Sequence, residues 1–443
     1  MRNELDAPDV GTLLKGSDIS LETTISLGKE LVDSRVGPIV HFSKPEISRQ
    51  SVPVYQYQTL IQKTSRISST GLSDPPNTAG TSLMEPQAMI TAIGEAIERY
   101  CLSMTNLSDF EFGAYSEFSE IAVPPAAFNM FSESQLSQRG LSERILNEGK
   151  YHWTATREIT SGDRRLVPGQ LIYLPFNHNT VFRSPISTGA ATGTGYLGAC
   201  YRAICEIIER ECLMITYLNK LSVPHIDKST IPDEAKTYHN ILKSRGRTVY
   251  LLNISLDQPV PTCLAIAVDS ESRPALSLGL GCDWNMGDAV RDALREALQI
   301  SDWEVEDLNK PPSPSDIDSV EERARFWAPD ERISDIRFWL TPTDEIAVED
   351  CREATDKNPL ETILRYLNKR DYECYIADVT TSDVAQYGFK TVKAIIPEMH
   401  PMHLREKFRY LGGNRLYELP VEIGLSNIKN TEDELNQVPQ PFL

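Results

Sequence analysis

The sequence is short of the features that mark membrane, secreted or disulfide-bonded proteins. No apolar run reaches the roughly 18 residues that a membrane-spanning helix needs, and the polar, acidic start at residues 1–6 is unlike a secretory signal. Cysteine is sparse, with 8 in 443 residues, which is too few for a disulfide framework in a chain of this length. We therefore expect a cytoplasmic protein whose thiols are reduced and lie in the core.

Basic residues and histidine are also in short supply. The 44 Lys and Arg are outnumbered by 63 Asp and Glu, which gives a formal net charge of −19. This charge repels a phosphate backbone, so we expect no nucleic-acid partner. Cys200, Cys205 and Cys212 lack the CxxC spacing of a zinc site. His400 and His403 are the only close histidine pair in the sequence, and we expect them in a loop rather than at a metal.

The common phosphate-binding loops are missing as well. No G-x-x-x-x-G-K-[ST] occurs, which excludes a P-loop. Residues 193–198 fit G-x-G-x-x-G literally and run into a helix. A dinucleotide-binding fold also needs a buried strand before the glycines and an acidic residue after the next strand. Residues 177–185 are instead polar and proline-bounded, and the next acidic residues lie on the helix itself, so we do not expect a Rossmann fold.

What the sequence does contain is a globular composition and alternating strands and helices. The apolar fraction is 40%, which is enough for a large core in one or two domains. Periodicity predicts helices at 20–32, 86–102, 198–218, 286–302 and 360–369, a hairpin over 151–176, and strands at 37–42, 248–254, 262–268, 276–280, 373–379 and 391–396. This order favours an α+β fold of mixed layers.

Three stretches interrupt this order. Breaker residues at 73–78 close the first part of the chain, and we place an N-terminal segment at 1–65 and the main domain at 66–443. Acidic, proline-rich residues near 311–350 predict an insertion or a mobile surface lobe. The proline-bearing end at 436–443 can only be an extended tail.

The strongest positive signal is a helical phrase that occurs three times. Ala-x-x-Glu-x-x-Glu occupies 92–98 and 203–209, and Ala-x-x-Glu-x-x-Gln occupies 293–299. Residues three apart share a helix face, so each phrase presents two oxygen-bearing side chains together. Paired carboxylates suit a hard cation such as Mg²⁺, which in proteins usually accompanies phosphates. The repetition predicts a nucleotide site that has no glycine-rich phosphate loop.

A structural network is the alternative explanation of these glutamates. Glu206 and Glu209 lie in a strongly apolar helix that must be largely buried. Uncompensated buried carboxylates are costly, and either a metal or an arginine can compensate them. Arg99, Arg210 and Arg291 are available for that role. The residues alone favour a metal–phosphate site and leave the arginine network open.

Together with these phrases, several longer motifs resemble the YcaO-domain family. The motifs lie at 94–100, 167–175, 187–193, 206–210, 289–299 and 411–417, and the proline-bearing C-terminus follows them. They cover about residues 65–443 in the order that the family shows. Within the family, the sequence is most similar to the D component of azoline-forming cyclodehydratases, which make thiazole/oxazole-modified peptides.

This resemblance implies a YcaO-like ATP-binding fold in which ATP and Mg²⁺ bind directly to the domain. It also implies an ATP-dependent cyclodehydratase. In such enzymes a Cys, Ser or Thr side chain of a ribosomal precursor peptide attacks the preceding backbone amide. ATP phosphorylates the amide oxygen, and phosphate leaves as the azoline ring forms. Phosphorylation converts a poor leaving group into a good one, and Mg²⁺ and cations offset the charge on the transferring phosphoryl group.

Matching the motifs position by position implies a role for each site residue. The predicted Mg²⁺ ligands are Glu95, Glu98, Glu206 and Glu209. The predicted ATP-binding set adds to these four Thr91, Arg210, Arg291, Glu296 and Gln299. The predicted catalytic set comprises Glu206, Glu209 and Arg291 together with Pro439, Pro441 and Leu443. The last three belong to the set because the resemblance implies that the tail tucks toward the active site.

The sequence also departs from the family pattern. Gly80–Ser82 stands where many relatives have Gly-Lys-Gly, so one expected cation is missing. The N-terminal segment is too short for the ubiquitin-activating-enzyme-like domain that is fused to some relatives. We therefore expect a separate partner of that kind to bind the leader of the precursor peptide, and a homodimer is compatible with the family. Thioamide formation with a TfuA-type partner and a non-catalytic nucleotide-binding accessory role are the alternative functions.

Overall fold

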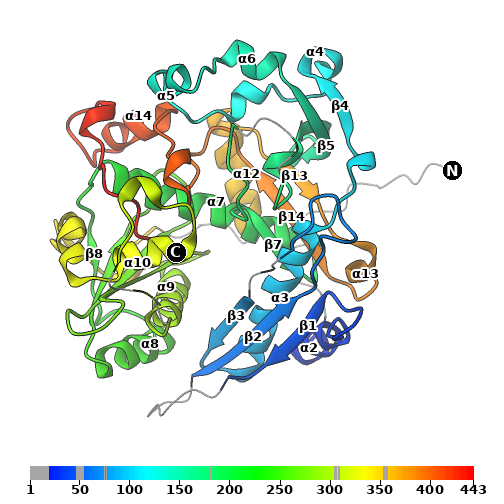
Figure 1. Cartoon of the computed structure of the whole chain (residues 1–443). Coiled ribbons are helices and arrows are strands. Elements are labelled where there is room, and N and C mark those ends of the chain that lie inside the picture. The colour runs from blue at the N-terminus through cyan, green and yellow to red at the C-terminus, as the bar shows by residue number, and fades with distance from the viewer. Residues whose placement is uncertain are drawn as a thin grey trace.

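The computed structural model describes residues 19–45, 54–73, 75, 77–176, 178, 182–303, 307, 310–352 and 358–443. Parts of three predicted stretches lie outside these residues, namely 1–18 and 46–53 of the N-terminal segment, 74 and 76 of the breaker, and 177 and 179–181 before the glycine motif. Layers of strands and helices alternate (Figure 1), which confirms the predicted α+β class. Within the described residues, no helix combines the length and the apolar character that a membrane span requires.

The described strands form three sheets. The first has the order β1-β2-β3, with β1 Ile39–Ser43, β2 Tyr55–Ile61 and β3 Asn77–Ser82. The second has the order β11-β10-β9-β8-β12, with β8 His225–Ile226, β9 Thr248–Asn253, β10 Thr262–Val268, β11 Leu276–Cys282 and β12 Glu345–Ile346. The third has the order β4-β5-β13-β14-β7, with β4 Glu111–Ala114, β5 Lys150–Glu158, β7 Ala190–Gly193, β13 Tyr375–Asp378 and β14 Lys390–Ile395, and β6 Arg164–Pro168 pairs with β5.

Three long helices carry the repeated phrases: α3 Glu85–Ser103, α7 Tyr196–Leu218 and α9 Met286–Ser301. Their ends fall within a residue or two of the predicted ones, because each helix has a continuous apolar face that marks its length. The other α-helices are α2 Leu21–Glu30, α4 Tyr115–Phe118, α5 Glu133–Gln138, α6 Glu143–Glu148, α8 Asp233–Ser244, α10 Val320–Trp327, α11 Arg337–Leu340, α12 Pro359–Arg370, α13 Ser382–Ala385 and α14 Asn414–Glu422.

Small residues let two of the long helices pack directly on strands. A Cβ atom at Gly80 on β3 would lie 2.2 Å from the carbonyl oxygen of Ala88 on α3. A Cβ atom at Gly279 on β11 would lie 2.0 Å from the carbonyl oxygen of Ala293 on α9. Real side chains cannot approach so closely, so glycine at these positions sets the distance between strand and helix. The helices that carry the phrases are thereby fixed against their sheets.

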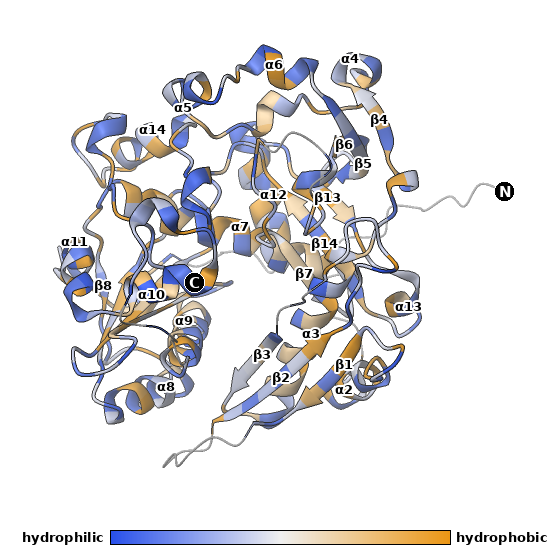
Figure 2. Ribbon diagram, in the orientation of Figure 1, coloured by the Kyte–Doolittle hydropathy of each residue, from blue (hydrophilic) through white to orange (hydrophobic). Residues whose placement is uncertain are grey.

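Helix α7 lies at the centre of the largest hydrophobic cluster. Ile204, Ile208 and Leu213 are fully buried, and α7 packs against β14 and β7. Figure 2 shows apolar residues along β13 and β14 beside this helix. Cys200 and Cys212 are free, buried thiols, as expected of core positions.

The predicted hairpin over 151–176 is correct only in its first part. Strands β5 and β6 pair in antiparallel register across the turn at 161–163, with Arg157 opposite Arg164. The second strand ends at Pro168, and a single 3-10 turn follows at Gly169–Leu171. Proline has no N–H for the ladder and glycine weakens a strand, so the pairing stops there.

Residues 311–350 contribute buried side chains to the core. Helix α10 and the turns around it bury Arg323, Phe326, Trp327 and Trp339, and their acidic residues lie on the outside. The aromatic residues are too few and too scattered among charges to produce a regular pattern in the sequence, so their burial was not predicted. That the stretch is an insertion or a mobile surface lobe stays a prediction. At the other end of the chain, β2 pairs with β3 across the predicted boundary at residue 65.

Candidate functional site

The three repeated phrases occupy equivalent places in three strand–helix units. In each unit the first glutamate of the phrase accepts a hydrogen bond from a backbone amide in or beside the preceding strand. The pairs are Glu95 with Ala79 (3.3 Å), Glu206 with Gly189 (3.0 Å) and Glu296 with Leu280 (2.6 Å). Such bonds fix one carboxylate oxygen and leave the other to interact with a cation. The repeated phrase in the sequence thus corresponds to three similarly placed carboxylates in the structure.

Arginines on the same helices pair with these carboxylates. Arg210 Nη1 lies 2.8 Å from Glu209 Oε1, and its Nη2 lies 3.7 Å from Glu206 Oε1. Arg99 Nη2 lies 3.6 Å from Glu95 Oε1. The carboxylate cluster and the arginine network, which the sequence left as alternatives, therefore occur in one place.

Negative charge is crowded at this site. The pKa of Glu98 and of Glu209 is raised to about 8 each, by burial and then by neighbouring carboxylates, while Arg99 and Arg210 oppose the shift. Burial also raises the pKa of Glu296. Folding thus destabilises the ionised forms of these carboxyl groups, and a bound cation would stabilise them.

The donor set fits a magnesium–nucleotide complex better than a metal held by protein alone. Among the described residues, no three His, Cys, Asp or Glu side chains lie close enough to form a preformed metal cage. Mg²⁺ in nucleotide sites is usually held by one or two carboxylates, with phosphates and water as its other ligands. Carboxylate oxygens are the ligands that such a hard cation prefers.

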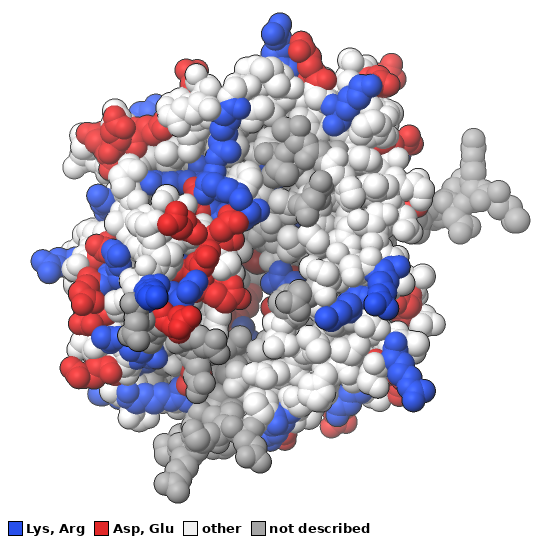
Figure 3. All heavy atoms as spheres, viewed as in Figure 1, with Lys and Arg blue, Asp and Glu red and all other residues white. Residues whose placement is uncertain are grey.

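Two cavities adjoin at Glu95. The first cavity has a volume of about 780 Å³, and its lining includes Thr91, Glu95, Glu98, Arg202 and Arg291. Residues 192–194, from the loop at the end of β7, complete one wall. Figure 3 shows a hollow on this face of the molecule, between the part that contains α9 and α10 and the part that contains α3.

The second cavity has a volume of about 460 Å³, and both charged and apolar side chains line it. Its charged lining includes Glu95, Arg99, Glu206 and Arg210. Its apolar lining includes Leu72, Leu174, Ile186, Met402, Leu404 and Phe442. The cavity therefore offers a charged surface beside the glutamates and an apolar surface for a less polar molecule.

The C-terminal tail, residues 436–443, reaches this second cavity. Phe442 is 2% exposed, and its ring centroid lies 4.2 Å from the guanidinium carbon of Arg210. The carbonyl of Pro439 accepts a hydrogen bond of 2.9 Å from the Tyr217 hydroxyl. Pro441 and Leu443 line a small adjoining pocket, and Leu443 also lines the second cavity. The tail is extended and packed, and it lies beside a residue of the second phrase.

Not every predicted site residue lines a cavity. Arg291 lines the first cavity, where it forms ion pairs with Asp288 and with Asp292, the latter at 3.2 Å. Glu209 and Glu296 are not among the lining residues of either cavity. Gln299 lies one helical turn beyond Glu296, is partly exposed, and lines neither cavity in the described structure.

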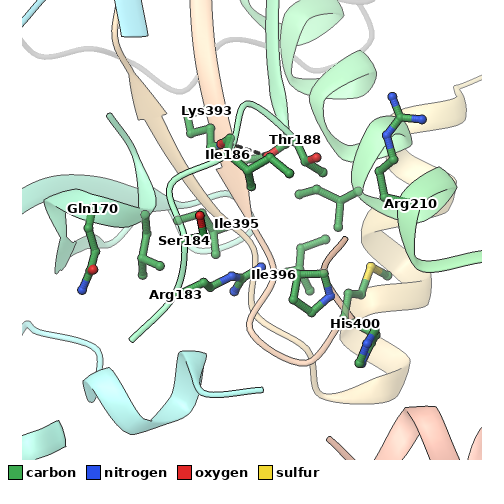
Figure 4. Close-up of a pocket in the computed structure, with 15 residues that line it drawn as sticks. Gln170, Arg183, Ser184, Ile186, Thr188, Arg210, Lys393, Ile395, Ile396 and His400 are labelled. Carbon is green, nitrogen blue, oxygen red and sulfur yellow. Dashed lines mark hydrogen bonds between the residues drawn. The ribbon is translucent and has the colours of Figure 1, made fainter. Parts of the chain in front are cut away.

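A buried lysine beside the site was not predicted from the sequence. Lys393 on β14 is 2% exposed, and its Nζ donates hydrogen bonds to the carbonyls of Ile186 (2.7 Å) and Thr188 (Figure 4). Burial lowers the pKa of Lys393 to about 7, and Glu206 and Glu98 oppose that shift. A lone lysine inside an apolar strand was the signal that could have identified it.

Arg202 is a second cation that the sequence analysis missed. It lines the first cavity, and its Nη2 donates a hydrogen bond of 2.8 Å to the carbonyl of Thr192. Arg202 stands one turn before Glu206 on α7, so both lie on the same helix face. Extending the second phrase by one turn toward the N-terminus would have included it.

Comparisons with known proteins were made for the sequence and for the fold. A model of the YcaO cyclodehydratase family, described as binding ATP and Mg²⁺, matches residues 79–400. A comparison with curated proteins found no match. Among solved structures, a heterocyclase in complex with substrate and cofactor has a TM-score of 0.78 at 20% identity, and the match covers 96% of this chain. The chain spans only 57% of the length of that heterocyclase.

Two further structures share the fold. YcaO from Methanopyrus kandleri, bound with AMPPCP and Mg²⁺, has a TM-score of 0.62 at 15% identity, with 89% of this chain and 94% of that chain covered. The E. coli microcin synthetase McbBCD complex with pro-MccB17 bound has a TM-score of 0.59 at 16% identity, with 83% and 91% covered. At these identities the structures establish the fold and not the substrate.

Proposed function

The chain belongs to the YcaO family, and on that premise we propose that it is an ATP- and Mg²⁺-dependent cyclodehydratase subunit. Its substrate is a ribosomal precursor peptide, in which it forms azoline rings from Cys, Ser or Thr residues. The observation that carries the proposal is the set of three equivalent carboxylate positions, two of which, Glu95 and Glu206, line two adjoining cavities. A site for ATP next to a separate site for a peptide is what this reaction requires.

ATP occupies the first cavity in this proposal, with Thr91 in its wall. The Mg²⁺ ligands are Glu95, Glu98, Glu206 and Glu209, which share the metal with the phosphates. The bound Mg²⁺ supplies Lewis-acid stabilisation of the charge on the transferring phosphoryl group. The low exposure of Arg210 (11%) and Glu209 (13%) supports their roles toward Mg²⁺ and phosphate, because charged groups act more strongly where water is excluded.

Two arginines contact the phosphates. Arg210 lines the second cavity beside the glutamates and needs little movement to do so. Arg291 must exchange its ion pairs with Asp288 and Asp292 for contacts with a phosphate. Glu296 and Gln299 complete the site from α9. Glu296 acts through Arg210, whose charge opposes the rise in the pKa of Glu296.

The precursor peptide occupies the second cavity. The apolar lining, which includes Leu174 and Met402, can bury side chains of a peptide segment. The peptide backbone then lies over the charged lining that contains Arg99 and Arg210. The leader of the precursor is bound by a separate partner protein.

The proposed reaction has two stages. The heteroatom of a Cys, Ser or Thr side chain forms a bond to the carbonyl carbon of the preceding residue and loses its proton. The former carbonyl oxygen attacks the γ-phosphorus of ATP, and ADP leaves. The bond between carbon and the phosphorylated oxygen then breaks, inorganic phosphate leaves, the amide nitrogen loses its proton, and a carbon–nitrogen double bond forms.

Glu206→Gln tests the site assignment. This change keeps the size of the side chain and removes the charge that holds the metal, so we expect ATP turnover to fall to background while the far-ultraviolet circular dichroism stays the same. Glu361→Gln is the matched control, because Glu361 is 55% exposed on α12, away from both cavities. Full ATP turnover in a well-folded Glu206→Gln variant would contradict the assignment.

Mass spectrometry of a precursor peptide incubated with the chain, its partner, ATP and Mg²⁺ separates the possible products. We expect the loss of one water mass for each Cys, Ser or Thr that is cyclised. Exchange of oxygen for sulfur would assign the chain to thioamide formation, and an unchanged mass in the presence of ATP turnover would assign it to an accessory role.

A further inference from the structure

Helix α10 buries an arginine that bonds to two distant segments of the chain. Arg323 is fully buried. Its Nη1 donates a hydrogen bond of 2.6 Å to the carbonyl of Gln440, and its Nη2 lies 2.8 Å from Glu406 Oε1 and donates to the carbonyl of Leu404. A buried guanidinium is costly unless its donors are satisfied. We call Arg323, Glu406 and Gln440 the tail anchor.

The side chain of Gln440 fixes the tail from the other side. It is 1% exposed. Its Nε2 donates a hydrogen bond of 3.1 Å to the carbonyl of His403, and its Oε1 accepts one of 2.6 Å from the amide of Phe442. The backbone on both sides of Pro441 is therefore held in one conformation.

This conformation places Phe442 on the candidate site. The Phe442 ring packs over Arg210, and Arg210 pairs with Glu209 and Glu206. An unbroken set of contacts thus leads from α10 through the tail to the carboxylates of the second phrase. A cation over an aromatic face is attracted to it and is shielded from water.

Other contacts hold only the earlier part of the tail. The amide of Asn436 donates a hydrogen bond of 2.7 Å to the carbonyl of Leu218, and the Tyr217 hydroxyl bonds to the carbonyls of Val438 and Pro439. Loss of the tail anchor would therefore release residues 440–443 and leave 436–439 in place.

We propose that Arg323 is a positioning residue that holds the last four residues of the tail so that Phe442 covers Arg210. The 311–350 segment thereby acts on the active site through the tail. The holding of the tail follows from contacts within the chain. Its effect on catalysis rests on the proposed function, because that function makes Arg210 a phosphate-contacting residue.

Hydrogen–deuterium exchange on the full chain, without nucleotide or peptide, tests the holding. In Arg323→Met we expect the Phe442 and Leu443 amides to exchange about tenfold faster, because bonds to a charged donor are lost, while α7 keeps its protection. Arg325→Met is the matched control on the same helix, since Arg325 is 28% exposed and its one ion pair, with Glu322, is long at 3.9 Å. Equal tail exchange in both variants would overturn the proposal.

Arg323→Lys guards against a variant that fails to fold. It keeps a positive charge opposite Glu406 but lacks the fork of donors that reaches three acceptors. We expect tail exchange between that of the wild-type chain and that of Arg323→Met. Two results together would mean that the arginine only stabilises the fold. Tail exchange would stay at the wild-type rate in Arg323→Lys. In Arg323→Met it would change only together with exchange across the whole of α10.

A double-variant cycle with Phe442→Ala tests the link to catalysis through the rate of ATP turnover. If Arg323 acts through Phe442, then Arg323→Met should lower turnover in the wild-type background and add little in the Phe442→Ala background. Additive losses would overturn the link. Tail exchange is measured without substrate. It therefore tests whether Arg323 holds the tail even if the product of the enzyme is not an azoline.

Discussion

At the scale of single residues, the site depends on carboxyl groups that the fold keeps partly buried. Glu98 and Glu209 have pKa values of about 8, whereas the ordinary value for a glutamate is about 4.3. Between roughly pH 4.5 and pH 8 these two groups therefore bind more protons in the folded chain than in the unfolded chain. Their contribution to stability should fall as the pH rises through that window.

Binding of Mg²⁺ and nucleotide should release protons. The metal needs deprotonated carboxylates, and near pH 7 Glu98 and Glu209 hold protons in the ligand-free chain. We expect the affinity for Mg²⁺ and AMPPCP to rise from pH 6 to pH 8 and to level off above pH 8. Titration calorimetry in two buffers of different ionisation enthalpy measures the release, and a heat that does not depend on the buffer would contradict the prediction.

A second residue-scale prediction concerns an ion pair behind the site. Arg415 Nε lies 2.8 Å from Glu211 Oε1, and its Nη2 lies 2.8 Å from Asp257 Oδ1. Glu211 is fully buried and follows Arg210 directly on α7. Arg415→Met should lower the free energy of unfolding by about 3–5 kcal/mol, because the fully buried Glu211 loses its charged partner, whereas Asp257 keeps its ion pair with Arg370 at 2.6 Å.

Chemical denaturation measures this change in stability. Arg365→Met is a suitable control, because Arg365 is 56% exposed and forms its ion pair on the surface of α12, where such pairs contribute less than about 1 kcal/mol. Equal stabilities of the two variants would show that the Arg415 pair contributes no more than a surface one.

At the scale of elements, the site depends on how closely helices approach strands. Helix α9 carries Arg291 and Glu296, and it lies against β11 with no room for a side chain at Gly279. Gly279→Ala should cost about 1–3 kcal/mol of stability through overpacking. It should also weaken nucleotide binding, because α9 must move away from the other two units. Thermal unfolding and nucleotide titration measure the two effects.

Gly198→Ala provides the control for this prediction. A Cβ atom at Gly198, near the start of α7, would have no neighbour within 4 Å, and alanine favours a helix over glycine by about 1 kcal/mol. We expect this variant to be as stable as the wild-type chain or more stable. Similar losses at both positions would mean that close approach of α9 to β11 is not what glycine provides.

The elements also show what the sequence could and could not predict. Helices α3, α7 and α9 were located to within a residue or two because each repeats its apolar positions with the period of a helix. The 169–171 turn and the packing of 311–350 were not predicted. The turn follows a strand that ends at a single proline, and the 311–350 segment buries Trp327 and Trp339 among charged neighbours. Neither stretch therefore shows a regular period of apolar residues in the sequence.

At the scale of the whole molecule, the site is assembled from distant parts of the chain, and this is where prediction from sequence ends. The phrases on α3, α7 and α9 identified the glutamates, but no local pattern indicates that Phe442 packs on Arg210, more than half the chain away. Lys393 and Arg202 each had a local signal, but only the folded structure places them beside the glutamates. The identity of the Mg²⁺ ligands, the boundary near residue 65 and the homodimer stay predictions.

The measurement that tests the central claim most directly follows one oxygen atom. A precursor peptide carrying oxygen-18 in the amide carbonyl that precedes a Cys is incubated with the chain, its partner protein, ATP and Mg²⁺, and the inorganic phosphate is analysed by mass spectrometry. The account predicts that phosphate gains one labelled oxygen for each ring formed. Rings that form while the label leaves as water, with unlabelled phosphate, would contradict the claim that ATP activates the peptide carbonyl.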